Sequence, residues 1–233
     1  MKLFPFFSLR RHLRRVLPWA ALAGLPLAPA QPATEARIDL STWVGRASVG
    51  AEDGAAPVAR FSGPAGIAVD AAGNLTIADT GNATLRRVAA DGTVSTLAGQ
   101  PGLMGQVDGP GAAARFATPQ HLALDGAGNL YVVDPVAVAI RKVTPAGVVS
   151  TFALLPLVPT INAPSGLAVT ADGQTIYFSD RGNHVIRRLT VADRTITVFA
   201  GQARFAGSDD GVGAAARFFD PADRFPRGAQ RRA

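Results

Sequence analysis

The fold is decided by residues 64–79, which read PAGIAVDAAGNLTIAD, because this stretch recurs in register along the chain. A second copy reads PQHLALDGAGNLYVVD over 119–134, and a third reads PSGLAVTADGQTIYFSD over 164–180. The copies follow one another at a period of roughly 45 to 57 residues, which is typical of repeat architectures. The chain is therefore built from repeated units rather than from one continuous fold.

Each copy goes on to two further apolar segments, such as TLRRV over 84–88 and VSTLAG over 94–99. Four short segments rich in Val, Ile, Leu and Thr, separated by Gly, Asn and Asp, predict four strands joined by hairpins. Gly73 and Gly128 precede asparagine and can take the positive φ of a tight turn. A four-stranded antiparallel sheet repeated radially is a propeller blade. The sequence thus predicts an all-β propeller with about three complete blades.

The repeated residues resemble the NHL repeat. The resemblance is carried by PAGIAVD over 64–70, ADTGN over 78–82 and DRGNHVIR over 180–187, and it covers roughly 41–221. It implies a β-propeller, usually of about six blades, that serves as a binding platform. The second copy departs from the pattern, because 134–139 read DPVAVA where Asp-x-x-Asn is expected, so a role for that asparagine is not implied there.

Partial copies flank the complete ones. STWVG over 41–45 matches STLAG over 95–99, so 31–63 are expected to hold the outermost strand of a clasp blade plus a connector. Blades are expected over 64–221. Asp210-Gly211 and Phe218 match the residues that precede a blade in the earlier copies, which predicts the start of another one. The basic tail 222–233 matches no strand of the repeat. These features predict an incomplete ring, cut short by a frameshift, an early stop or a partial gene. Assembly of two such halves into one ring is the alternative.

Residues 1–30 have the order of a secretory signal peptide. Cations cluster up to Arg15, an apolar run extends from Val16 to Leu27, and Ala28-Pro29-Ala30 is a small-residue cleavage site. The run is about 12 residues long, short of the ~20 that a membrane-spanning helix needs. We expect an exported, periplasmic or extracellular protein without a stable membrane span. A retained anchor and a twin-arginine export route through Arg10-Arg11 are the weaker alternatives.

The charge of the chain lies at its ends. There are 23 basic and 17 acidic residues, and removing the five cations of 1–30 leaves 18 against 17. A nucleic-acid partner would require a basic stripe on the folded body, so none is expected. The absence of cysteine excludes disulfides, thiolate metal sites and cysteine catalysis.

The expected binding face is formed by the loops between second and third strands, which lie beside the long connectors 45–63, 100–118 and 202–220. Loops on a rigid scaffold commonly carry function, so a protein or a small ligand is expected there; plain solvated connectors are the alternative. The candidate residues are Asp79, Asn82, Asp134, Asp180, Asn183 and His184 in the loops, with Asp108 and Asp210 in the connectors.

No catalytic residue, metal ligand or cofactor is predicted. Each loop offers one carboxylate where calcium sites collect several, so the loops are expected to be Asx-type turns with a left-handed glycine. His121 begins an inner strand and is a candidate for facing a central channel. The enzymatic alternative is a fragment of a propeller hydrolase or lyase, resembling gluconolactonase-like or amidating enzymes, with its metal ligands on other blades.

Two structural roles and one surface complete the predictions. In the Arg-Phe pairs of the connectors, the phenylalanine is expected to pack as a plug between neighbouring blades. The arginine is expected to bind the acidic side chains of the loops. These pairs are Arg60-Phe61, Arg115-Phe116 and Arg217-Phe218. Uncovered blade faces are expected to favour self-association.

Overall fold

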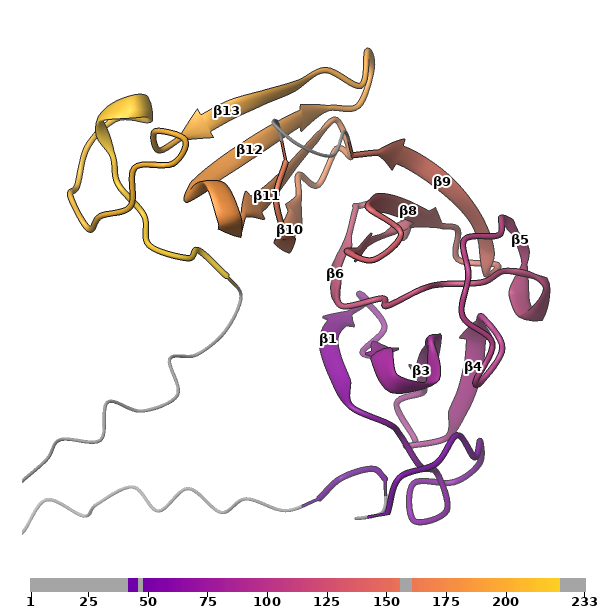
Figure 1. The fold of residues 1–233 in the computed structure, drawn as a ribbon. Coiled ribbons are helices and arrows are strands. Elements are labelled where there is room, and N and C mark those ends of the chain that lie inside the picture. The colour runs from indigo at the N-terminus through magenta and orange to yellow at the C-terminus, as the bar shows by residue number, and fades with distance from the viewer. Residues whose placement is uncertain (1–41, 46–47, 156–160, 223–233) are drawn as a thin grey trace, which may run out of the picture. The chain divides into compact units, whose positions relative to one another are not determined.

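In the computed structural model the described residues are 42–45, 48–155 and 161–222, and all of them belong to one unit that begins at Thr42. They form strands and short 3-10 turns (Figure 1). The predicted signal peptide and the tail after Ala222 lie outside the described residues.

Three antiparallel sheets follow one another along the chain, each in the order of a meander. The first, blade 1, consists of β1 (Pro64–Val69), β2 (Leu75–Asp79), β3 (Thr84–Val88) and β4 (Val94–Ala98). Blade 2 consists of β6 (His121–Leu124), β7 (Leu130–Asp134), β8 (Ala139–Val143) and β9 (Val148–Leu154), with β5 (Gly109–Pro110) added outside β9. Blade 3 consists of β10 (Pro164–Val169), β11 (Thr175–Asp180), β12 (Val185–Thr190) and β13 (Ile196–Ala200). The predicted four-stranded blades are confirmed.

The hairpins have the predicted turn chemistry. Gly73 and Gly128 have φ of +83° and +79°, and Gly173 in blade 3 has +68°. Aspartates close these turns: Asp70 and Asp125 each accept two backbone N–H groups and the amide of the asparagine four residues on. The alternation of strand residues then places one apolar set on each side of every sheet.

The core lies between successive blades. β1, β6 and β10 are neighbours, as Figure 1 also shows for β1 and β6. One buried cluster joins Ala78 and Leu85 of blade 1 to Leu122 and Val132 of blade 2, and a second joins Tyr131 of blade 2 to residues of blade 3. A blade is therefore stabilised mainly by the sheets packed against its two faces.

The predicted outer strand at 41–45 needs correction. Ser41 lies outside the described residues, and Thr42–Gly45 pair with no strand of the described chain. Gly45 instead donates its N–H to the Ala56 carbonyl at 2.9 Å, within the connector. The physical reason is that a single strand needs a partner edge for its own N–H and C=O groups, and the Gly45 N–H is already bonded within the connector.

Candidate functional site

The second strand of each blade ends in an aspartate whose side chain is fully buried. Asp79, Asp134 and Asp180 are each 0% exposed. Their carboxylates accept backbone N–H groups from the incoming connector: Asp79 from Ser62 at 2.6 Å, Asp134 from Ala117 at 2.7 Å and Asp180 from Asn162 at 2.8 Å. The three carboxylates therefore fix the loops from within, and the assignment of these loops to a binding face stays a prediction.

A buried arginine in the third strand faces each of these sites. Arg86 Nη1 donates to Asp79 at 3.0 Å, and Arg187 Nε donates to Asp180 at 2.6 Å. Arg141 occupies the same position in blade 2 and is also buried. Sequence reasoning missed these arginines, although Asp and Arg recur seven residues apart in every copy. That constant spacing was the available signal.

A second acid, from the connector, completes the surroundings of the arginine in blades 1 and 2. Arg86 pairs with Asp53 at 2.6 Å and Arg141 pairs with Asp108 at 2.7 Å. Asp108 also accepts the Thr151 N–H and hydroxyl, each at 2.9 Å. Desolvation raises the pKa of Asp108, but these hydrogen bonds and the Arg141 charge outweigh it and hold the pKa below its ordinary value. The carboxylate of this predicted binding residue is thus already engaged within the blade.

The loops themselves are 3-10 turns, η1 (Thr80–Asn82) and η3 (Arg181–Asn183). The left-handed residue is Ala83 or His184, with φ of 55° or 59°, and the expected left-handed glycine is incorrect. Gly81 is required for another reason: a Cβ there would lie 2.7 Å from the Ser62 carbonyl oxygen. The turn therefore lies against the connector with no room for a side chain.

The asparagines of these turns also face inward. Asn82 Nδ2 donates to Asp79 Oδ2 and to the Gly50 carbonyl, each at 2.7 Å, and Asn183 Nδ2 donates to Asp180 Oδ2 at 2.8 Å. Like the aspartates, the predicted binding residues Asn82 and Asn183 connect parts of the protein to one another. A ligand on this face would have to contact other side chains.

His184 joins its loop to the connector that follows blade 3. Its Nδ1 accepts the Asp220 N–H at 3.2 Å, and its ring stacks on Phe219 with centroids 5.8 Å apart. Arg181 donates to both oxygens of Asp220 at 2.8 and 2.7 Å, and hydrogen bonding to Asp220 raises the pKa of Arg181. The end of the connector is therefore fixed on the loop.

His121 connects two inner strands. It begins β6, and its Nε2 lies 3.2 Å from the Ser165 hydroxyl oxygen in β10. Its orientation toward a central channel stays a prediction.

For the Arg-Phe pairs, the predicted role of the phenylalanine is confirmed in Phe116, whereas the predicted role of the arginines is corrected. Phe116 is fully buried in the cluster between blades 1 and 2, as predicted for a plug. Arg60 lies 3.4 Å from Glu52, but Arg115 and Arg217 donate to nearby carbonyls and to Gln100 and Gln202 instead of acids. For Arg115 the reason is that Asp108 is already bound by the strand arginine Arg141.

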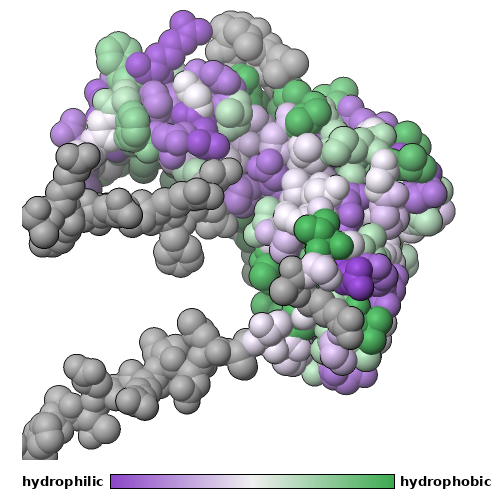
Figure 2. Space-filling model, turned by 60° about the horizontal axis from the view of Figure 1, so that its bottom comes forward, coloured by the Kyte–Doolittle hydropathy of each residue, from purple (hydrophilic) through white to green (hydrophobic). Residues whose placement is uncertain are grey.

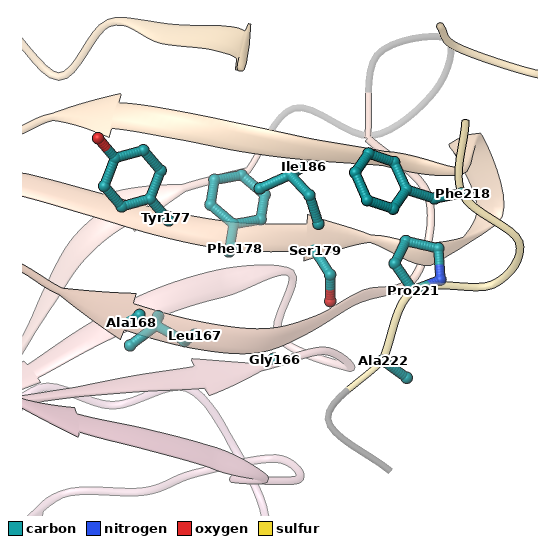
Figure 3. A pocket seen from close by; sticks show the side chains of 10 residues that line it. All are labelled: Gly166, Leu167, Ala168, Tyr177, Phe178, Ser179, Ile186, Phe218, Pro221 and Ala222. Atoms are coloured by element: carbon teal, nitrogen blue, oxygen red, sulfur yellow. The ribbon is translucent and has the colours of Figure 1, made fainter. Parts of the chain in front are cut away.

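A hollow of about 380 Å³ lies on the face of blade 3 (Figure 3). Ser179, Ile186 and Phe218 line it at the positions that Ala78, Leu85 and Phe116 hold between blades 1 and 2. The hollow thus repeats one side of the interface between blades and is not a separate ligand cavity.

Exposed apolar side chains gather at the loop ends of the blades. Gly102 N–H donates to the Asn82 carbonyl and Arg204 N–H to the Asn183 carbonyl, so the two connectors run beside the loops. Figure 2 shows hydrophobic atoms at the surface among polar ones. We call five of the exposed apolar residues of these loops and connectors the loop-face set, which leaves out Val107 and Val212 of the same connectors. It consists of Leu103, Met104, Val136, Phe205 and Phe219.

Two searches of the described residues returned nothing. No group of three or more His, Asp or Glu side chains there could hold a metal ion. Within the same residues, no helix is long and apolar enough to cross a membrane.

The chain is similar in sequence to a mammalian NHL-repeat protein. The chain is 31% identical over 163 residues to NHL repeat-containing protein 2 of Bos taurus, which is 60% of this chain and 22% of that protein. The chain thus spans about a fifth of the relative's length. No family model matches.

Solved structures with partial likeness include two enzymes and a binding protein. Virginiamycin B lyase from Staphylococcus aureus has a TM-score of 0.47 at 22% identity, covering 63% of this chain and 43% of that one. A streptogramin B lyase has 0.45 at 19%, with the same coverage. An auxiliary nutrient binding protein from Bacteroides thetaiotaomicron has 0.47 at 23%, covering 57% and 36%.

The family assignment rests on three findings: the repeat recurs in register, each copy folds as a four-stranded blade, and the aligned relative carries the same repeat. Together these findings support an NHL-repeat β-propeller family for this chain.

Proposed function

We propose that the protein is a non-enzymatic, extracytoplasmic binding scaffold, which contacts a protein or a small ligand with its loop-face set. The observation that carries this proposal is that exposed apolar side chains lie beside loops that buried hydrogen bonds hold in place. Met104 is 65% exposed and Phe205 57%, while the neighbouring loops are held by fully buried carboxylates.

Fixed loops favour binding because little conformational entropy is lost when a partner docks. Exposed apolar side chains that are held in place contribute favourable burial at the same time. The engaged aspartates and asparagines then act indirectly, since they set the position of the loops without touching the ligand.

Site-specific photocrosslinking tests the proposal in the exported protein. A photoreactive amino acid at Met104 or Phe205 is expected to form a specific crosslinked product, identified by mass spectrometry. The control position is Asp91, which is exposed in the hairpin at the opposite end of blade 1. Equal crosslinking from Asp91 and Met104, or none from the loop positions, would contradict the choice of face.

The extracytoplasmic location has its own test. If residues 1–30 are removed on export, N-terminal sequencing of the exported protein should begin at Gln31. A product that retains Met1 in the membrane fraction would contradict cleavage and leave the choice of binding face untouched.

A further inference from the structure

In blades 1 and 2 the outer edge of the fourth strand is covered by an extended piece of connector. Gly54 bridges Val94 of β4, and β5 pairs with β9. The residue before each covering glycine is an aspartate that accepts the N–H of a fourth-strand threonine. Asp53 accepts from Thr96 at 3.0 Å, as Asp108 does from Thr151 at 2.9 Å. Each cover thus combines strand pairing with a charge-assisted hydrogen bond.

Blade 3 has the same register, and no such cover lies on it within the described residues. A bulge precedes Arg86 opposite Thr96 and Arg141 opposite Thr151, and the same bulge precedes Arg187 opposite Val198. Because the register is shared, the Val198 N–H points where the threonine N–H groups meet their aspartates. Within the described residues β13 pairs with β12 alone, and Val198 is 45% exposed. An exposed strand edge readily accepts another strand.

The arginine of blade 3 lacks the second acid. The sequence has no Asp or Glu between Asp134 and Asp172, so the connector entering blade 3 supplies none. Among the described residues Arg187 donates through Nε to Asp180, and its side chain is 10% exposed where Arg86 and Arg141 are 0% exposed. Within the described residues no acid contacts the part of the guanidinium that binds Asp53 or Asp108 in the other blades.

The chain carries another folded copy of the covering segment, which covers no strand within the described residues. The connector after blade 3 repeats the hydrogen bonds of the one before blade 2: Gly201 N–H donates to Gly213 O at 3.0 Å, as Gly99 does to Gly111 at 3.1 Å. At the Asp108 position stands Asp210, which is exposed, and the next non-glycine residue, Val212, is 92% exposed. An acid and an extended segment are therefore presented to solvent.

We propose that residues 210–212 of a second copy dock on the outer edge of β13, with Asp210 accepting hydrogen bonds from Arg187 and from the Val198 N–H. Each copy carries both the edge and the segment, so two copies exchange the contact reciprocally in a twofold dimer, the commonest symmetric assembly. This contact is independent of the loop-face set and of the proposed function.

Sedimentation velocity of the purified chain over a range of concentrations tests the dimer. The wild type should shift from monomer to dimer, and Asp210→Asn should raise the dimer dissociation constant by about tenfold or more, as expected for a lost charge-assisted bond. Asp209→Asn is the matched control, because it removes the same charge one residue away. The peptide GQVDGPG, residues 105–111 of the chain, should dissociate the dimer, and its Asp→Asn version should not.

Hydrogen exchange locates the contact on the acceptor strand. Val198 and its neighbours in β13 should exchange more slowly in the dimer, and Asp210→Asn should remove that protection. A monomer at every concentration would overturn the proposal. So would a dimer that Asp210→Asn and Asp209→Asn weaken equally, because association would then run through other faces of the blades.

Discussion

Blades 2 and 3 have the same strands and the same register, yet they are fastened differently. In blade 2, Arg141 is enclosed by Asp108 and by the Val107 and Arg115 carbonyls, and β5 covers the outer strand. In blade 3, the described partner of Arg187 is Asp180, and no other strand of the described residues pairs with the outer edge of β13. The difference originates in the connector, which is long and carries Asp108 before blade 2, and is short and without an acid before blade 3. The connector, and not the strand pattern, thus decides how tightly a blade is closed.

Removal of the buried arginine is expected to have the largest effect. Arg86→Met should lower the free energy of unfolding by about 3–5 kcal/mol, because buried Asp79 loses its counter-charge. Arg187→Met should cost less, since fewer hydrogen bonds are broken. Urea titration followed by circular dichroism measures both, and equal losses would show that the connector acid contributes nothing.

The plug phenylalanines give the next comparison. Phe116→Ala should destabilise by about 3–4 kcal/mol, because it leaves a cavity between two packed sheets. Phe218→Ala should cost clearly less, because that ring is only partly buried and lines the open hollow of blade 3. Thermal unfolding of both variants decides the order, and a larger loss for Phe218 would mean that another element covers this face.

The loop glycines sharpen the comparison between the first and third blades. Gly81→Ala should cost about 1–3 kcal/mol, since its Cβ would meet the backbone of Ser62. At Gly182 the nearest obstacles are the Asn162 amide atoms, which can rotate away and leave the Asn162 Cβ at 2.9 Å, so Gly182→Ala should be milder. Melting temperatures of the pair are the measurement, and the reverse order would contradict the rigidity assigned to the blade 1 loop.

The smallest effect concerns Asp108 and acid. Its folded-state pKa is lowered, so its contribution is complete above the unfolded value near 3.9 and is lost as the pH falls through the lower folded value. Asp108→Asn should reduce the melting temperature slightly at pH 7, with the gap to wild type closing toward pH 3. The side chain is half exposed, so solvent screens the contribution. In a dilute sample Asp210→Asn is the control and should show no gap at either pH.

The strands were predictable because their signal is local. Apolar alternation and the glycines of the hairpins predict the meander within each copy, and all three copies show the same pattern of strands. The buried Asp–Arg pairs were harder to foresee, because charged residues are usually assigned to the surface. Only packing between sheets shows that Asp79 and Arg86 share a dry environment. The asparagines were assigned to a binding face for the same reason.

The left-handed residue also could not be located from the repeat alone. Glycine is the usual choice for positive φ, but in these loops it is required by a close approach of Ser62, and Ala83 takes the strained conformation. The need for glycine at position 81 therefore depends on Ser62, a neighbour 19 positions away along the chain. The Gly81 N–H also donates to the Ser62 carbonyl.

The tie from Asp53 to Thr96, and that from Asp108 to Thr151, each span 43 residues. Such a long sequence separation has a kinetic meaning, because distant contacts form late and slow the folding of a domain. When the chain is synthesised N-terminus first, the hairpins of blade 1 can form early. The contact between Asp53 and Thr96 can form only after the fourth strand has been made. Blade 3 has no such long-range contact within the described residues, so its sheet can form from neighbouring hairpins alone. The same sheet should also open more easily than that of blade 1. The order in which the blades become protected during folding should therefore follow their connectors rather than their position along the chain.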